Sequence, residues 1–288
     1  SLSIPPVPEK DFVEAARLNL EMISPIEAIN SYRSYQLICE GKGGKTEALA
    51  AFTHSQEVVD FLSVLKEADF IVIAVEFLAL ATVRLIKEYG VGIKRDAPYL
   101  VINLSRDGPD LSILKNSNLY FNYFVPWKTL QDETSGRKFG VKEVQDFLVR
   151  HIKQIVTFYS SRWGEQVAEV VLINSPISKD VVQTIKDNFQ IDVQFLTIAK
   201  YGHLSPLWIG ALGAALRGKI PRAKDAFISL TAVGVEEEYY QELTLGFIRS
   251  WRNTIVITLG FLSLVFLVAT FTLRGTADAL AKELENRA

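Results

Sequence analysis

Three runs of strand-forming residues lie close together in the middle of the sequence: Tyr99-Leu-Val-Ile-Asn-Leu104, Asp110-Leu-Ser-Ile-Leu114 and Leu119-Tyr-Phe-Asn-Tyr-Phe-Val125. Two short connectors join them, Ser105–Pro109 and Lys115–Asn118, and both are rich in residues that favour turns. Short apolar runs separated by turn residues are typical of strands that pair with their sequence neighbours. This stretch therefore predicts a three-stranded antiparallel meander.

Helical and strand patterns alternate after the meander. An amphipathic pattern over 141–160 predicts a long helix, and two β–α units follow it, 167–173 with 179–188 and 193–198 with 206–217. Three antiparallel strands, a helix and two β–α units form the plan of one half of the ribonuclease-H-like, actin-type ATPase fold. The sequence therefore predicts an α/β chain built around an actin-like lobe.

The chain before the meander also alternates between helical and strand patterns. We expect a helix over 55–68 with Ser55 as its N-cap and with Val58, Phe61, Leu62 and Leu65 on one face. A loop over 91–97 precedes the change of pattern and marks a predicted domain boundary. The predicted helices are 9–22, 55–68 and 77–89, and the predicted strands are 32–40, 47–52 and the apolar, buried 70–75.

One glycine-rich stretch invites a phosphate-binding interpretation. Gly44-Lys45-Thr46 matches the last three residues of a P-loop, but the glycine that should stand five positions before Gly44 is Cys39. A P-loop also leads into a helix whose N-terminus cradles the phosphate. Here Gly41–Lys45 joins two strand-like runs, so we expect a hairpin turn.

An uncharged block of 20 residues, Thr254–Leu273, stands near the C-terminal end of the sequence. As a helix it is about 30 Å long, which matches the hydrocarbon core of a bilayer. Arg249 and Arg252 precede it, Arg274 follows it, and Trp251 stands where an interfacial aromatic residue would lie. A buried core helix is the alternative, but such a helix usually shows a polar face. The block therefore predicts a membrane span, and the few flanking basic residues do not decide its orientation.

Composition excludes several classes of function. The 288-residue chain carries a net charge of −2, so its overall charge gives no reason to bind nucleic acid, and we expect no such partner. Cys39 is the only cysteine, which excludes an intrachain disulfide and a cysteine-rich zinc site. The three histidines lack the spacing of a metal-binding pair, and no hydrolase motif occurs. We therefore expect neither a metal site nor a catalytic residue.

Four segments carry a resemblance to a known family, through their order and not through any single diagnostic motif. In this order they resemble PilM, the actin-like protein of type IV pilus assembly, and more distantly FtsA and the cytoplasmic part of GspL. The resemblance covers most of residues 1–218. The segments are Pro5–Leu37, Ala48–Ile86, Tyr99–Pro126 and Val170–Gly218, the last of which ends in Ala211-Leu-Gly-Ala-Ala-Leu-Arg-Gly218.

The residues after 218 resemble the start of PilN, the membrane partner whose cytoplasmic tail docks on PilM. Ala226-Phe-Ile-Ser-Leu-Thr231 is similar to the docking segment of PilN, and a charged approach (236–252), the apolar block and a short tail (277–288) follow in the PilN order. The resemblance implies a PilM–PilN fusion, or a GspL-like protein with the same layout. It implies that the docking residues are Phe227, Ile228 and Leu230.

The resemblance also implies a domain layout and a place in the cell. The layout is 1–95 (a 1C-type subdomain and the end of the first lobe), 96–218 (the second actin-like lobe), 219–253 (docking segment and linker), 254–273 (transmembrane helix) and 274–288 (start of an extracytoplasmic coiled segment). The first phosphate hairpin of the family would lie before residue 1, so we expect a truncated N-terminus. Residues 1–253 would be cytoplasmic in a single-pass protein of the inner membrane. The implied partners are platform proteins of the PilN and PilO type, the assembly ATPase and the lipid bilayer.

The nucleotide site that the resemblance implies is degenerate in this sequence. The family has Asp and Gly where Asn103 and Ser105 stand, and Gly-Gly where Asn174-Ser175-Pro176 stands. Proline removes a backbone donor, and Asn and Ser add side chains where the nucleotide needs close backbone approach. We therefore expect a scaffold that is not an enzyme and holds no cofactor; ATP with Mg²⁺ on an actin-like ATPase, and a membrane-anchored ligand sensor, are the alternatives. Asp107-Gly108 could be a displaced phosphate loop, but we favour an ordinary hairpin connector. The degenerate site comprises Asn103, Ser105, Asp107, Gly108, Asn174 and Ser175.

Overall fold

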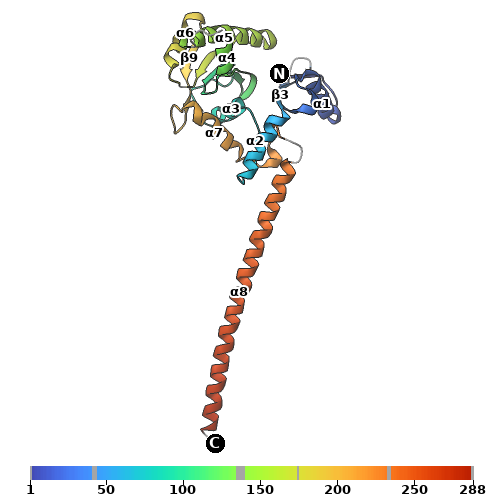
Figure 1. Ribbon diagram of the computed structural model, residues 1–288, viewed down its shortest axis with the longest axis vertical. Helices are drawn as coiled ribbons and strands as arrows, with labels where there is room; N and C mark the ends of the chain where they lie inside the picture. The colour runs from blue at the N-terminus through green and yellow to red at the C-terminus, as the bar shows by residue number, and fades with distance from the viewer. Residues whose placement is uncertain (1, 41–43, 134–139, 174, 232–234, 287–288) are drawn as a thin grey trace. The chain divides into compact units, whose positions relative to one another are not determined.

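A computed structural model describes residues 2–40, 44–133, 140–173, 175–231 and 235–286 (Figure 1). The chain forms two compact units. The first comprises Ser1–Phe70 and Ala74–Ala232, and the second comprises Ile71–Ile73 and Val233–Ala288.

A five-stranded sheet organises the first unit. Its strand order is β7-β6-β5-β8-β9, with β5, β6 and β7 antiparallel and with β5, β8 and β9 parallel. Parallel strands need crossover connections, which the helices α5 and α6 provide. The predicted meander, long helix and β–α units are confirmed, and the topology is that of a ribonuclease-H-like lobe. The bounds are β5 Tyr99–Leu104, β6 Pro109–Lys115, β7 Asn118–Phe124, α5 Val141–Trp163, β8 Glu169–Leu172, α6 Ser178–Asn188 and β9 Asp192–Phe195.

Helices cover both faces of this sheet. Figure 1 shows α5 and α6 on one side and α3 (Leu78–Tyr89) with α7 (Pro206–Arg217) on the other. Aromatic side chains fasten α5 to the sheet, because the ring of Phe147 stacks on that of Tyr123 with centroids 6.4 Å apart. All six residues of β5 are buried, as expected for a strand enclosed on both faces.

A small sheet forms the N-terminal part of the same unit. Its order is β1-β3-β2, all antiparallel, and the predicted hairpin is β2 with β3. Ala16 and Leu20 of α1 pack on it in a separate small core. Gly41–Gly43 lie outside the described residues, but Lys45-Thr46 leads into a strand and not into a helix. The bounds are β1 Leu2–Ile4, η1 Glu9–Asp11, α1 Phe12–Ile23, η2 Ala28–Asn30, β2 Ser31–Glu40 and β3 Thr46–His54.

Two predictions for the segment after this sheet are wrong. Residues 70–75 form no strand, because within the described residues only Val75, at the end of the run, bonds a neighbouring segment and no ladder forms along it; Phe70 is 65% exposed. Helix α2 (Ser55–Glu67) is capped by His54 and not by Ser55. It buries Val58 but leaves Phe61 63% exposed, so the predicted apolar face is only partly covered.

Short elements complete the first unit. The predicted loop after α3 contains β4, which pairs with β10 in a two-stranded antiparallel sheet. Core residues on both sides of the predicted boundary at 95/96, such as Ile86 and Leu100, belong to one hydrophobic cluster, and the five-part domain layout stays a prediction. The bounds are β4 Gly90–Val91, α4 Trp127–Glu133, β10 Thr197–Ile198 and η4 Arg222–Lys224.

The second unit is dominated by one helix, α8, which runs unbroken over Val235–Glu285 (Figure 1). The predicted charged approach, apolar block and tail are therefore parts of a single helix of 51 residues. Within it, Tyr239–Lys282 is long and apolar enough to cross a membrane by length and composition, and its most apolar window has no buried residue.

Candidate functional site

The segment that contains the predicted docking residues packs against α3, α7 and β2 of the first unit, and we call the surface that it covers the groove. Ile228 is fully buried and Leu230 is 5% exposed, and both belong to the main hydrophobic core, while Phe227 is half-buried. The backbone of the segment is also bonded: the Leu230 N–H donates to the Val75 carbonyl over 2.8 Å. The Ser229 N–H donates to the Ser34 hydroxyl of β2 over 3.3 Å. We call residues 225–231 the docking segment.

The wall of the groove is a close crossing of α3 and α7. A Cβ added to Gly213 would lie 2.0 Å from the carbonyl oxygen of Ala81, so only glycine allows the two helices to approach this far. Arg84 of α3 uses this proximity, because its Nη1 donates to the Gly213 carbonyl over 2.8 Å. The Ala211–Gly218 motif therefore has a packing role here.

A buried ion network joins the two helices to the docking segment. Glu76 accepts hydrogen bonds from Arg84 and from Arg217, with the shortest N···O distance 2.7 Å in each pair. Arg217 continues to Asp225 over 2.8 Å, and Arg222 reaches the same carboxylate over 2.5 Å. Breaking a buried pair costs about 3–5 kcal/mol, because it leaves a desolvated charge without a partner. The network therefore holds the segment to the helices.

Arg217 also contacts the backbone of the docking segment. Its Nη1 donates to the Ile228 carbonyl over 2.7 Å and its Nη2 to the Phe227 carbonyl over 3.2 Å. The guanidinium of Arg84 lies over the Phe227 ring, 4.9 Å from its centroid, which is cation–π geometry. The arrangement can hold an extended peptide by its carbonyls, its ring and its apolar side chains.

The electrostatics of Asp225 follow from these contacts. Burial alone would raise the pKa of its carboxyl group, since the side chain is fully buried. Hydrogen bonds from Arg217 and from the Phe227 N–H, with the charges of Arg217 and Arg222, outweigh burial and hold the pKa below its ordinary value. The contacts therefore favour the ionised carboxylate.

The sequence predicts the apolar residues Phe227, Ile228 and Leu230, whose docking role stays a prediction, but it does not name the charged residues around them. Arg84 stands inside the buried run Ala79–Ile86 of α3, and a charge in that position is a signal of a buried pair. Arg217 stands in the Ala211–Gly218 motif, where the sequence does not reveal its partner. Glu76 and Asp225 lack any local signal.

The predicted nucleotide residues of the β5–β6 connector form an ordinary turn. The Ser105 hydroxyl donates to the Gly108 carbonyl over 2.9 Å and accepts the N–H groups of Asp107 and Gly108. A Cβ on Gly108 would lie 2.0 Å from the Val125 carbonyl oxygen, so this glycine serves close packing. Two backbone donors that a phosphate would need are thus engaged by Ser105.

Asn103 lies at the end of β5 in a buried polar cluster. It is 2% exposed, and among the described residues neither its Oδ1 nor its Nδ2 has a hydrogen-bond partner. It stands opposite Asp110 in the ladder, and the carboxylate of Asp110 accepts hydrogen bonds from Ser112 (2.8 Å) and Asn122 (2.9 Å). Burial raises the pKa of Asp110 above its ordinary value, and these two bonds only partly offset it.

The remaining predicted positions lie after β8. Asn174 lies outside the described residues, and the Ser175 N–H donates to the Ser178 hydroxyl at the start of α6 over 2.7 Å. Because β5 and β8 are parallel neighbours, Asn103 and Ser175 lie at the same edge of the sheet. Within the described ranges, no group of three or more His, Cys, Asp or Glu side chains is placed to hold a metal ion.

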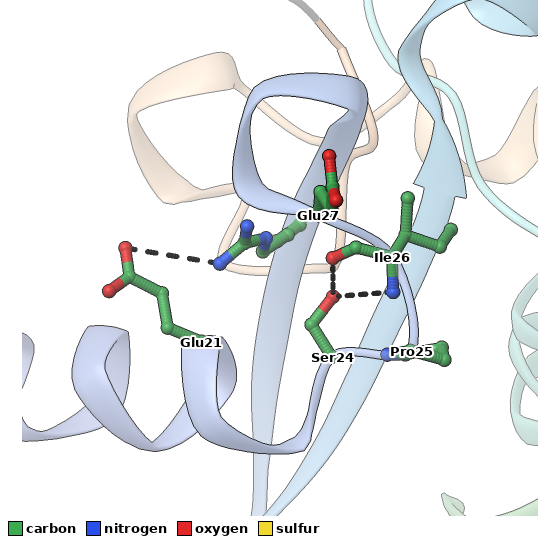
Figure 2. A pocket seen from close by; sticks show the side chains of 6 residues that line it. Glu21, Ser24, Pro25, Ile26 and Glu27 are labelled. Atoms are coloured by element: carbon green, nitrogen blue, oxygen red, sulfur yellow. Dashed lines mark hydrogen bonds and ion pairs between the residues drawn. The ribbon is translucent and has the colours of Figure 1, made fainter.

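Two of the cavities in the described part of the first unit differ in size and surroundings. Figure 2 shows the smaller one, about 340 Å³, where the Ser24 hydroxyl bonds both the N–H and the carbonyl of Ile26 and so serves a local turn. The larger one, about 460 Å³, lies beside the docking segment. Its lining comprises Leu49, Ala50, Ala51, Phe52, Thr53, Val75, Glu76, Phe77, Tyr120, Phe121, Asn122 and Leu230.

Comparison with known proteins identifies the fold. No protein-family model matches the sequence, and no curated protein matches it. Among solved structures, a chain of the PilM-PilN type IV pilus biogenesis complex is similar at 15% identity and a TM-score of 0.59, covering 76% of each chain. The ethanolamine utilization protein EutJ from Carboxydothermus hydrogenoformans matches at 10% identity and a TM-score of 0.31, covering 64% of this chain and 86% of that one. A protein with an actin-like ATPase fold from Bacteroides thetaiotaomicron matches at 12% identity and a TM-score of 0.36, covering 72% and 67%.

These findings confirm the predicted fold class. The strand order of the large sheet and the similarity to the PilM-PilN structure agree on an actin-like α/β lobe. The chain has a PilM-like fold followed by one long apolar helix.

Proposed function

We propose that the chain is a membrane-anchored scaffold of a type IV pilus or type II secretion-like assembly platform, with its PilN-like segment docked on its own PilM-like lobe. One observation carries the proposal: Ile228 and Leu230 are buried in the groove of the first unit, and the chain continues from them to an apolar helix. The PilM-PilN structure supports the platform as the place of action.

Membrane anchoring rests on the exposed apolar surface of α8. Side chains such as Phe261, Leu262 and Phe266 are between 46% and 70% exposed. An apolar helix with no covering protein is stable in lipid and not in water. In the proposal, residues 1–253 face the cytoplasm of a single-pass inner-membrane protein.

Docking within one chain gives the scaffold its mechanism. Covalent linkage raises the effective concentration of the segment at its groove, so occupancy does not depend on the amount of a separate partner. Platform proteins of the PilN and PilO type, and the assembly ATPase, are the proposed partners of the exposed surfaces.

We further propose that the scaffold does not hydrolyse ATP. The Ser105 hydroxyl engages the backbone donors of the phosphate-hairpin position, and Asn103 replaces the family's Asp. One observation favours the alternative of a nucleotide-binding ATPase. The buried Asn103 amide, which has no hydrogen bond among the described residues, and the buried Asp110 could bond polar groups of a ligand. The cavity of about 460 Å³ would suit the sensor alternative.

Membrane extraction tests the anchor. We expect the full chain to stay in the membrane pellet after an alkaline carbonate wash, and the double variant Leu262→Arg/Phe266→Arg to be extracted, because each central arginine costs about 2.5–3.5 kcal/mol of insertion. Leu280→Arg, beyond the apolar block, is the control and should stay in the pellet. Extraction of the unmodified chain would contradict the proposal.

Calorimetry with Mg-ATP on the same purified chain decides between the scaffold and the ATPase. Tight binding of Mg-ATP would favour the ATPase.

A further inference from the structure

The docking segment contains one acidic residue, Asp225. Asp225 forms more hydrogen bonds than a residue of a simple linker would. The carboxylate accepts hydrogen bonds from Arg217 Nε (2.8 Å), Arg217 Nη2 (3.3 Å), Arg222 Nη1 (2.5 Å) and the Phe227 N–H (3.1 Å). Its side chain has no exposed surface. We infer that Asp225 determines the specificity of the groove, which selects an extended peptide with an acid two residues before an aromatic, three before Ile and five before Leu. The inference rests on the proposed docking function.

Charge makes the acid necessary. Without the docking segment, the wall of the groove holds two guanidinium groups, Arg84 and Arg217, against one carboxylate, Glu76. Arg222, which precedes the segment and also bonds Asp225, adds a third positive charge. The side chains of Arg84 and Arg217 are at most 6% exposed, and that of Arg222 is 14% exposed. A neutral peptide would bury the surplus positive charge without a partner, and that is strongly unfavourable. An acidic peptide compensates it.

Geometry fixes where the acid must stand. One guanidinium, that of Arg217, binds both the Asp225 carboxylate and the carbonyls of Phe227 and Ile228. Because Arg217 contacts both the acid and the two carbonyls, it fixes the number of residues between the acid and Phe227 and Ile228. The Phe227 N–H returns to the carboxylate, which sets the backbone so that Ile228 and Leu230 enter the core at the two-residue period of a strand.

A peptide-binding assay tests the inference. The full chain in nanodiscs carries Ile228→Ser/Leu230→Ser, which weakens its own segment, and labelled peptides of residues 223–232 are titrated by fluorescence anisotropy. We expect the unmodified peptide to bind and the Asp225→Asn peptide to bind about 10- to 100-fold more weakly, because hydrogen bonds to a buried charged group are lost. The matched control is the Lys224→Gln peptide, changed at an exposed position, which should bind within about twofold of the unmodified peptide.

Hydrogen exchange on the otherwise unmodified chain gives a second reading that does not depend on an emptied groove. The Leu230 amide, bonded to Val75, reports opening of the segment. We expect Asp225→Asn to speed its exchange at least about tenfold and Lys224→Gln to leave it unchanged. Equal exchange and equal peptide affinity for Asp225→Asn would overturn the inference and leave docking intact. An unprotected Leu230 amide in the unmodified chain would instead refute docking itself.

Discussion

Two buried polar regions of the first unit differ in how well their groups are partnered. At the end of β5, Asn103 is buried with neither amide atom bonded among the described residues. At the docking segment, the Asp225 side chain has no exposed surface and accepts four hydrogen bonds. Buried polar groups without partners destabilise a fold, whereas bonded groups favour a single arrangement. In the ion network the Nε of Arg84 also lacks a partner among the described residues, but its two Nη atoms are bonded to Glu76. The buried carboxylate of the docking segment is therefore well hydrogen-bonded. The buried amide of Asn103 at the β5–β6 hairpin has no partner among the described residues.

The two carboxylates of these regions show the same contrast. Burial raises the pKa of Asp110, because its two hydrogen bonds do not compensate for lost water. Arg217 and the other donors lower the pKa of Asp225 despite burial. Ionisation thus costs stability at the hairpin and contributes stability at the docking segment.

Removal of the central arginine should break the comparison most strongly. We expect Arg217→Met to destabilise the first unit by about 3–5 kcal/mol, because Glu76 and Asp225 lose their shared partner in a buried site. Urea denaturation in detergent, followed by near-UV circular dichroism, measures the change. Arg162→Met, which removes a more exposed pair with Glu47, is the control and should cost less than about 1 kcal/mol. Equal costs for the two variants would show that the network does not hold the segment.

Truncation of the buried anchor should have the next largest effect. Ile228→Ala is expected to cost about 3 kcal/mol, through lost burial and the cavity left behind. The control is Leu207→Ala, at a position 76% exposed, and the same denaturation assay should show almost no change. A loss well below 1 kcal/mol for Ile228→Ala would mean that the segment is not docked in solution.

The pH dependence should separate the two carboxylates by sign. Asp225 contributes stability above its ordinary pKa of 3.8, and that stability is lost as the pH falls through the lowered pKa of the folded state. Asp110 acts in the opposite sense, since stability is lost as the pH rises through its raised pKa. We measure the urea midpoint between about pH 3 and pH 6. In Asp225→Asn the midpoint should decrease less on acidification than in the unmodified chain. In Asp110→Asn the midpoint should decrease less as the pH rises. The same slope change in both variants would refute the contrast.

The smallest effect is expected at the unpaired amide. Asn103→Leu should change stability by no more than about 1 kcal/mol, and in the stabilising direction, because it replaces a buried group that forms no bond among the described residues. Mg-ATP calorimetry on the same variant sharpens the result. Loss of measurable nucleotide binding in Asn103→Leu, relative to the unmodified chain, would restore the hairpin as a ligand site.

The sequence allowed the large sheet to be predicted because its signals are local. Turn residues separate β5, β6 and β7, and the periods of α5 and α7 agree with their neighbours. Residues 70–75 misled because strand composition shows only a tendency, and the neighbour that would complete the ladder is not encoded in the run itself. The apolar docking residues were predicted through resemblance, and their docking role stays a prediction. The Glu76–Arg217 pair spans 141 positions, and no local pattern reveals such a contact.

The unbroken helix α8 fixes distances along its axis. Its 51 residues correspond to about 76 Å, of which the apolar block of 254–273 occupies about 30 Å. About 28 Å of helix therefore precedes the block and about 18 Å follows it. Since no proline interrupts residues 235–285, a tilt imposed at one end of the helix is carried to the other. A bilayer around the apolar block would therefore set the distance of each end of α8 from the lipid.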